Sequence, residues 1–329
     1  DSPGTPELRT AVAESYNDRY GTSLASANVI AGCGGKQELF NLMLALVDDG
    51  DEVIIPAPYW VSFPQQVELV GGTPVIVDLS LENGFRPTPE LIEAAFTDRT
   101  KIVILNSPSN PTGALIERDA LGKIIEICAK RGVVLIYDET YEYFVYDGNE
   151  HVSAAEWIGQ YPDTVVIVNS MSKTYAMTGW RIGFAIADQP LVKAMSSIQS
   201  HSTSNPSSIS QHAAIEGLTG SKESLEEMID AYSMRRSWLV PQLSSLPGFS
   251  CEPPGGAFYV FPYVADLFGK GEITDSTSLS SFLLERARVA VVPGIAFGND
   301  EHVRISYATS LEKLQEAVQR MRQALEEIW

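Results

Sequence analysis

Short apolar runs alternate with helix-like segments through the first two thirds of the chain. Six runs rich in valine and isoleucine predict strands, at residues 51–57, 73–79, 101–107, 133–139, 164–170 and 180–187. Between them, segments such as 89–96 and 117–130 place their apolar residues at helical spacing. Strands this continuously apolar are typical of sheets that are covered on both faces. The pattern predicts an α/β fold with a mostly parallel sheet covered by helices.

A different pattern follows a long helical segment near 221–245. Three further strand candidates lie at residues 253–264, 287–294 and 302–308. The last helix, which Ser310 would cap, repeats apolar residues on one face at Leu311, Leu314, Met321 and Leu325. We therefore expect a large α/β domain over residues 1–225 and a smaller C-terminal α+β domain over residues 226–329.

Charge and composition narrow the possible partners. The 329 residues include 42 acidic and 23 basic side chains, which gives a net charge of −19. Nucleic acids and anionic membrane surfaces require a basic face, so neither is expected as a partner. No apolar run approaches the roughly 18 residues of a membrane span, and no signal peptide is visible. Three widely spaced cysteines and four scattered histidines predict no disulfide framework and no metal site, and favour a cytoplasmic protein.

Polar residues follow three of these predicted strands and a further strand candidate before Gly32, at the point where each ends. Parallel strands bring their carboxyl ends to one edge of the sheet, and ligands bind beyond that edge. The four segments are GCGGK (32–36), NSPSNPTG (106–113), the stretch from Asp138 to Tyr141, and NSMSK (169–173). These segments place glycines, a carboxylate, a phenol, hydroxyls and an amine on one side of the predicted sheet.

The glycine cluster predicts an anion site. Gly34, Gly35 and Lys36 precede an apolar helix over 37–47, and amide groups at a helix N-terminus attract phosphate. The segment matches neither a Walker A loop nor a dinucleotide fingerprint, because Gln37 stands where those motifs need another residue. A plain turn remains the alternative for this segment alone. Ser170 and the fork-shaped Arg181 would add phosphate donors.

Asp138 and Lys173 are the candidate catalytic groups. A carboxylate at the end of an apolar strand needs a cationic partner, for which a protonated pyridine nitrogen would serve, with the phenol of Tyr141 nearby. A partly desolvated lysine can form a Schiff base with an aldehyde. Alone, Asp138 could cap a helix and Lys173 could be a solvated loop residue. Together with the phosphate groups they predict pyridoxal 5′-phosphate as cofactor.

Several motifs resemble those of class I aminotransferases, the fold type I pyridoxal-phosphate enzymes. They are SMSKTYAMTGWRIG (170–183), NSPSNPTG (106–113), YDETY (137–141) and HVRISYATS (302–310). GGKQELFNL (34–42), PAPYWVSFPQQ (56–66) and VVPGIAFG (291–298) are similar to the bacterial aspartate and aspartate/prephenate aminotransferase branch. The resemblance extends over nearly the whole chain in family order.

This resemblance implies a role for each candidate residue. Lys173 resembles the Schiff-base lysine and proton carrier, Asp138 the ring-nitrogen partner and Tyr141 the phenol that bonds the 3′ oxygen. Trp60 resembles the aromatic residue that stacks on the ring and faces the substrate; a strand-end tryptophan is the alternative. Asn110 resembles the residue that contacts the 3′ oxygen and the substrate carboxylate, and Arg304 the arginine that binds the substrate α-carboxylate. Lys36 also resembles the group that faces a substrate side-chain carboxylate. The phosphate-binding positions are Gly34, Gly35, Lys36, Ser170 and Arg181.

The resemblance also implies a reaction and an assembly. The expected reaction is transamination between an L-amino acid, with aspartate or glutamate preferred, and a 2-oxo acid in a homodimer. Prephenate, aromatic or alanine-type substrates and a C–S lyase activity on the same fold remain alternatives. Family members carry roughly sixty more residues before the segment that begins here at Gly4. Those residues belong to the small domain and supply a glycine near the substrate and a tyrosine near the neighbouring subunit's phosphate.

Overall fold

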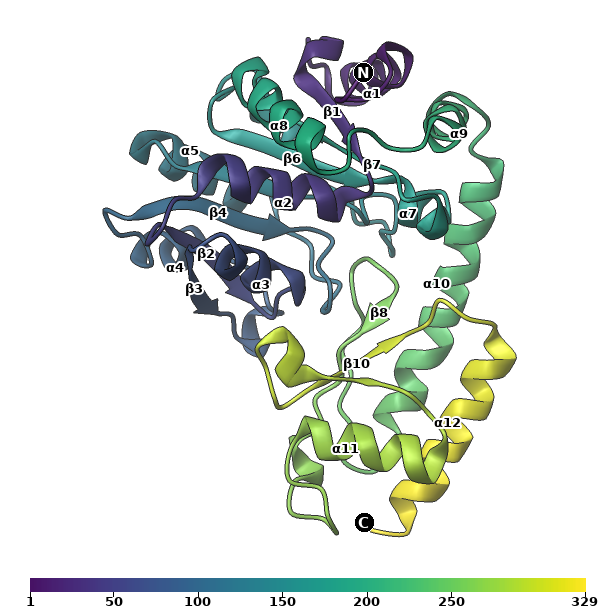
Figure 1. Ribbon diagram of the computed structural model, residues 1–329. Helices are drawn as coiled ribbons and strands as arrows, with labels where there is room; N and C mark the ends of the chain where they lie inside the picture. The colour runs from purple at the N-terminus through teal and green to yellow at the C-terminus, as the bar shows by residue number, and fades with distance from the viewer.

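A seven-stranded sheet forms the centre of the larger unit in the computed structural model, which describes residues 1–329 (Figure 1). Its strand order is β1-β7-β6-β5-β4-β2-β3. Only β7 runs antiparallel to its neighbours, so the expected mostly parallel sheet is confirmed. The strands are β1 (Val29–Gly32), β2 (Glu52–Ala57), β3 (Thr73–Asp78), β4 (Thr100–Asn106), β5 (Val134–Asp138), β6 (Val165–Ser170) and β7 (Gly183–Ile186).

Helices cover both faces of this sheet. One face packs against α2 (Gly35–Leu46), α3 (Ser62–Leu69) and α8 (Gln189–Ser202). The other packs against α1 (Pro6–Tyr20), α4 (Pro89–Ala94), α5 (Arg118–Arg131), α6 (Ala155–Ile158) and α9 (Ser208–Thr219). Along β4, Val103 and Leu105 point to one core, whereas Ile102 and Ile104 point to the other. This double burial explains why the strands read as continuous apolar runs.

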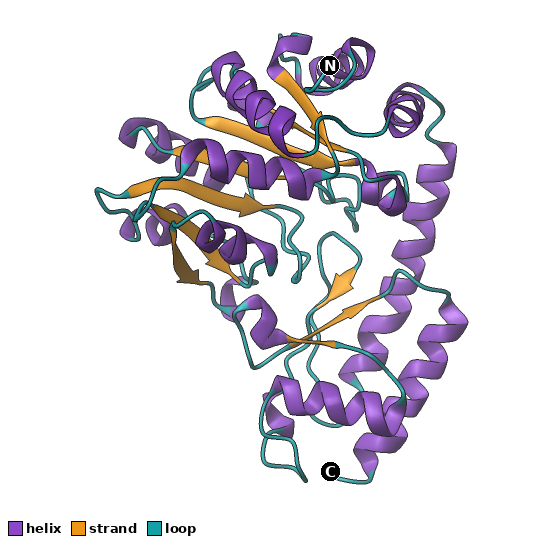
Figure 2. Ribbon diagram, in the orientation of Figure 1, coloured by secondary structure: helices purple, strands orange, loops and turns teal.

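The remainder of the chain forms a smaller α+β unit (Figure 2), whose core also includes Tyr141, Phe144 and Tyr146 from the segment after β5. Helix α10 (Glu223–Ser244) extends from the larger sheet to this unit (Figure 1). The antiparallel sheet β8-β10-β9 consists of β8 (Tyr259–Val260), β10 (Val303–Ser306) and β9 (Val292–Pro293). It packs with α11 (Ser276–Phe282) and α12 (Leu311–Glu326), whose N-cap is Ser310 as expected. The domain boundary expected at residues 225/226 falls inside α10, and this division remains a prediction.

Two predicted strands are much shorter than expected. Of residues 253–264 only Tyr259–Val260 is a strand, since Pro253, Pro254 and Pro262 have no N–H to donate to a neighbouring strand. Of residues 287–294 only Val292–Pro293 pairs. The chain before it forms a π-helical turn at Leu283–Ala287, followed by Arg288 with a left-handed φ of 55°. None of the helices combines the length and apolarity that crossing a bilayer requires.

Helix α2 departs from the uniformly apolar helix that the sequence predicts. Leu44 is exposed, whereas Glu38 in the first turn is fully buried. One Glu38 oxygen has no hydrogen-bond partner, and the other lies 3.4 Å from the Asn41 amide nitrogen. Burial raises the pKa of this carboxyl group to about 8, so Glu38 holds its proton at neutral pH.

Glu38 should therefore make the free energy of unfolding fall as pH rises. Between about pH 5 and about pH 8 the folded chain keeps a proton on Glu38 that the unfolded chain has released, which costs about 1.4 kcal/mol per pH unit. Glu38→Gln should remove this loss, so the variant gains stability relative to the unsubstituted protein as pH rises. Urea unfolding across this range measures the difference, with exposed Glu68→Gln as control. Parallel curves for all three proteins would contradict the prediction.

Candidate functional site

A cavity of about 400 Å³ lies beyond the carboxyl ends of β4, β5 and β6, with β8 and β10 contributing from the smaller sheet. Its volume falls in the range of small-molecule sites. Ten predicted residues line it: Gly35, Lys36, Trp60, Asn110, Asp138, Tyr141, Ser170, Lys173, Arg181 and Arg304. Gly34, the remaining one, caps α2 beside the cavity. A larger cavity of about 690 Å³, next to residues 81–86 and 250–255, contains none of them.

One end of the cavity is built as an anion cradle. Helix α2 starts at Gly35, so the amides of Gly35 and Lys36 have no acceptor within the helix, whereas the Gln37 N–H donates to the Gly34 carbonyl at 3.0 Å. Gly34 has a φ of +94°, and a Cβ atom there would lie 2.6 Å from Arg181 Nη2. Arg181 donates Nη1–H to the Thr178 carbonyl at 2.8 Å and Nη2–H to the Cys33 carbonyl at 3.2 Å. The glycine is therefore required both by backbone conformation and by the closeness of the guanidinium group.

We expect Gly34→Ala to weaken cofactor binding about tenfold. The added methyl group must displace Arg181 from the helix N-terminus, and φ at this position is unfavourable for alanine. Gly50→Ala is the matched control, because Gly50 has a similar φ of +83° but open space around its Cβ position. Titrating the cofactor-free variants with pyridoxal 5′-phosphate measures both affinities. Equal affinities for the two variants would contradict the assignment of Gly34 and the N-terminus of α2 to phosphate binding.

The middle of the cavity contains the buried carboxylate of Asp138. Its Oδ1 accepts the Thr140 N–H at 3.0 Å, and no helix begins after it, so the helix-cap alternative is wrong. Burial raises the pKa of Asp138 to about 6, although the hydrogen bond from Thr140 acts in the opposite direction and lowers it. A cationic group bound beside Asp138 would favour the ionised form. The residue therefore fits a protonated ring nitrogen.

Lys173 lies in the short helix α7 (Met171–Thr174), directly after β6. The side chain is half-buried in the cavity rather than solvated on a loop, and its Nζ lies 5.7 Å from the centre of the Phe258 ring. Burial, followed by the positive charges of Arg304 and Arg181, lowers the pKa of Lys173, while Asp138 opposes the shift. A lowered pKa increases the fraction of neutral amine, which is the nucleophilic form.

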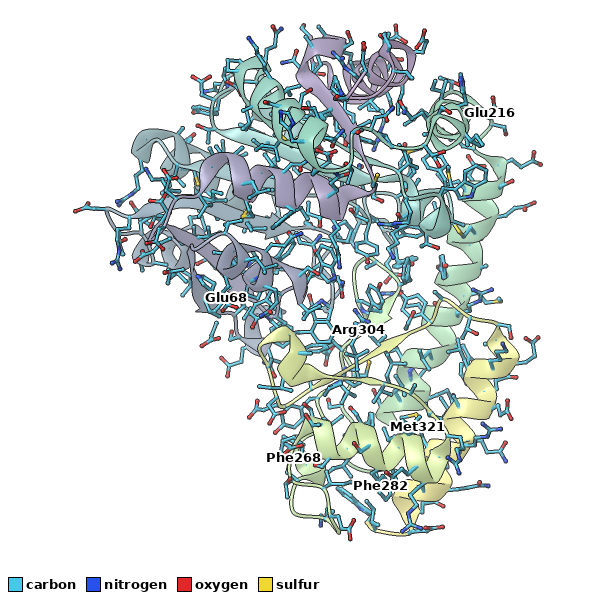
Figure 3. The ribbon with its side chains drawn as sticks, in the orientation of Figure 1. Glu68, Glu216, Phe268, Phe282, Arg304 and Met321 are labelled. Carbon is cyan, nitrogen blue, oxygen red and sulfur yellow. The ribbon has the colours of Figure 1, made fainter.

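Arg304 reaches the cavity from β10 of the smaller sheet (Figure 3). Its Nη1 donates to Asn110 Oδ1 at 2.9 Å, and its guanidinium carbon lies 4.4 Å from the Tyr259 ring centre and 4.8 Å from the Phe297 ring centre. Its buried Nε has no acceptor in the protein. An arginine that is fixed by these contacts and still has a free donor is suited to bind a carboxylate.

Trp60 and Lys36 stand together on a neighbouring part of the wall. Trp60 is half-buried, and Lys36 Nζ lies 4.8 Å from its ring centre. Phe63 packs edge-on against the same ring at 5.4 Å. The cavity thus combines a phosphate-sized anion cradle, a carboxylate, an amine and carboxylate-binding cations, a donor set that suits pyridoxal 5′-phosphate and an acidic substrate.

Sequence reasoning missed further cavity residues. Asn106 donates to the Asp138 carbonyl at 2.9 Å and accepts the Asn110 N–H at 2.7 Å, so it joins β4 to β5 at the cavity. Its place at the end of an apolar run was a usable signal. Tyr259 gave no such signal, because it stands in the apolar run GAFYVF and resembles a core residue. Thr140, Ser172 and Thr178 also line the cavity.

A buried hydrogen-bond network lies directly behind the strand ends. Tyr16 of α1 donates to Glu139 at 2.6 Å, and Asn169 donates to Tyr16 at 2.9 Å and to Glu142 at 2.7 Å. His151 lies 3.1 Å from Glu139, within a cluster whose possible ligand atoms are all within 4.8 Å of one another. The carboxylate oxygens of this cluster already have partners within the protein, so it acts as a network that joins α1 to β5 and β6.

Comparison with known families gives one match that spans nearly the whole chain. The family described as aminotransferase class I and II matches residues 1–321. An aspartate aminotransferase of Geobacillus stearothermophilus is 44% identical over 325 residues, which cover 99% of this chain and 83% of the relative. An aspartate/prephenate aminotransferase of Cereibacter sphaeroides is 46% identical over 324 residues, covering 97% and 81%.

Solved structures give the same result. The aspartate aminotransferase of Rhizobium meliloti superposes with a TM-score of 0.95 at 42% identity, covering 100% of this chain and 84% of that one. An aspartate aminotransferase of Thermus thermophilus, solved with maleate, superposes with a TM-score of 0.93 at 41% identity, covering 98% and 83%.

Proposed function

Because the chain belongs to the class I and II aminotransferases, we propose that it transfers the amino group of L-aspartate or L-glutamate to a 2-oxo acid, with Lys173 and Asp138 as its main catalytic groups. The family resemblance and fold type I are confirmed, and the cofactor is pyridoxal 5′-phosphate. The observation that supports the proposed roles is the convergence of the predicted residues on one cavity.

When bound, the cofactor supplies an aldehyde and a cationic ring that accepts electron density from the substrate. Lys173 is the amine that joins the cofactor and then moves a proton at the substrate Cα. Asp138 keeps the ring nitrogen protonated. Tyr141 would donate to the 3′ oxygen of the bound cofactor, and Trp60 would contact its ring. Gly34, Gly35, Lys36, Ser170 and Arg181 would hold its phosphate.

The substrate preference rests on two cations. Arg304, with Asn110 beside it, binds the α-carboxylate, and Lys36 faces a second carboxylate next to Trp60. Relatives named for aspartate support this assignment, as does the Thermus thermophilus structure with maleate, itself a dicarboxylate. Prephenate also has two carboxylates and is the second substrate candidate, supported by the Cereibacter sphaeroides relative.

We also propose that the protein is a cytoplasmic homodimer. Three large apolar side chains are exposed on this surface: Leu44 of α2, Val61 at the N-cap of α3, and Leu69 of α3. They line a hollow that also includes Lys36 and Arg181, so a second copy covering this surface would adjoin the phosphate end of the site. The mass in solution, measured by sedimentation, tests the dimer.

The first experiment is an absorbance spectrum of the purified protein with pyridoxal 5′-phosphate, repeated after addition of L-aspartate. We expect a band of the protein-bound cofactor that is replaced by the band of its amino form. If other amino acids but not aspartate converted the bound cofactor to its amino form, the assignment of Lys36 to a substrate side-chain carboxylate would be wrong. Absence of any bound cofactor would contradict the proposed function.

A further inference from the structure

Tyr259 of β8 joins two parts of the cavity that the proposed function treats separately. Its hydroxyl oxygen lies 3.0 Å from that of Tyr141, the phenol assigned to the cofactor. The face of its ring lies 4.4 Å from the guanidinium carbon of Arg304, the group assigned to the substrate. Tyr259 also lines the cavity, although it is only 7% exposed.

The hydrogen bond between the two phenols restricts how their protons are used. Each hydroxyl has one proton to donate, and Tyr259 is the only protein group hydrogen-bonded to the Tyr141 hydroxyl. Burial, reinforced by Tyr259, raises the pKa of Tyr141 well above its usual value, so Tyr141 is a proton donor rather than a phenolate. Once Tyr141 donates its proton to the cofactor, its bond with Tyr259 persists only if Tyr259 donates.

Other buried phenols of this unit behave differently. Tyr146 and Tyr307 both donate to the Ala257 carbonyl, at 2.6 and 3.0 Å, the usual way for a buried tyrosine to satisfy its hydroxyl. Tyr259 bonds no carbonyl and bonds instead the phenol that faces the cavity. Its position therefore serves the site as well as the core of the unit.

We propose that Tyr259 is a positioning residue with two separable roles: its hydroxyl directs the Tyr141 proton to the 3′ oxygen of the cofactor, and its ring holds Arg304 in place for the substrate carboxylate. The inference rests on the proposed function and extends it to a residue of the smaller sheet. A donated hydrogen bond polarises Tyr141 and strengthens its own donation. The ring contact stabilises the cation without using any of its N–H groups.

Two substitutions separate the roles. Tyr259→Phe keeps the ring and removes the hydroxyl. We expect the affinity of the cofactor-free protein for pyridoxal 5′-phosphate to fall about fivefold, and the pH midpoint of the bound cofactor's absorbance to rise by about 0.3 unit. KM for aspartate should stay unchanged, because the ring contact with Arg304 is kept. Tyr259→Leu also removes the ring, so KM should rise about fivefold as well. Tyr307→Phe, which removes the hydroxyl of a buried tyrosine that does not line the cavity, is the matched control and should leave all three quantities unchanged.

A double-mutant cycle supplies the decisive measurement. In a Tyr141→Phe background the hydroxyl of Tyr259 has nothing to direct, so adding Tyr259→Phe should not move the pH midpoint further. Additive shifts, or a Tyr259→Phe protein that matches Tyr307→Phe in affinity and pH midpoint, would overturn the inference. If the unsubstituted protein bound no cofactor, the proposed function itself would fail, and that outcome is recognised before any variant is compared.

Discussion

Replacing Lys173 by alanine is expected to abolish turnover, lowering kcat by at least about 10⁴-fold. In the proposed mechanism this residue supplies both the amine that joins the cofactor and the base that moves the Cα proton. The cavity lining contains no histidine and only one other lysine, Lys36, which lies beside Trp60 and is assigned to anionic groups. The measurement is the rate of transamination between aspartate and a 2-oxo acid at saturating cofactor.

Two variants make the Lys173 result specific. Lys193→Ala removes an exposed lysine of α8 and should leave kcat unchanged. Lys173→Arg keeps a positive charge in the cavity but has no amine that can lose its proton at neutral pH, so it should be as inactive as alanine. Substantial activity in Lys173→Arg would show that charge, rather than the amine, is what the site requires.

Much of the site was predictable because it depends on the ends of buried strands. The apolar runs of β4 and β5 end at Asn106 and Asp138, and that of β6 ends at Asn169 followed by Ser170, and parallel pairing brings these ends to one edge. The run of apolar residues reveals each strand, and the first polar residue after it marks the edge. The register of the parallel sheet then determines where these side chains lie relative to one another.

The contribution of the smaller unit was not predictable from pattern alone. Tyr259 and Arg304 reach the cavity from β8 and β10, and nothing in the strand patterns determines how that sheet faces the larger one. The resemblance to a family identified Arg304 but gave no signal for Tyr259. Apolar periodicity also failed at Glu38, because a protonated carboxyl group can occupy a buried position that the pattern assigns to an apolar residue.

Asp138→Asn is expected to lower kcat by roughly 10³-fold or more, since it removes a buried charge and keeps the size of the side chain. The amide cannot hold a proton on the ring nitrogen, so the ring loses most of its capacity to accept electron density. Asp138→Ala should be at least equally impaired. Exposed Asp163→Asn is the control and should have unchanged kcat. Near-normal kcat in Asp138→Asn would refute the ring-nitrogen assignment.

The pH dependence of cofactor affinity tests the same assignment independently of turnover. Burial raises the pKa of Asp138 to about 6, so lowering the pH through that value protonates the carboxylate and removes the negative charge that attracts the ring. Affinity for pyridoxal 5′-phosphate should therefore fall below about pH 6 in the unsubstituted protein. In Asp138→Asn affinity should be weaker at neutral pH and should lack this step. A step that persists in the variant would assign the titration to another group, whereas its loss together with kcat would tie both effects to one carboxylate.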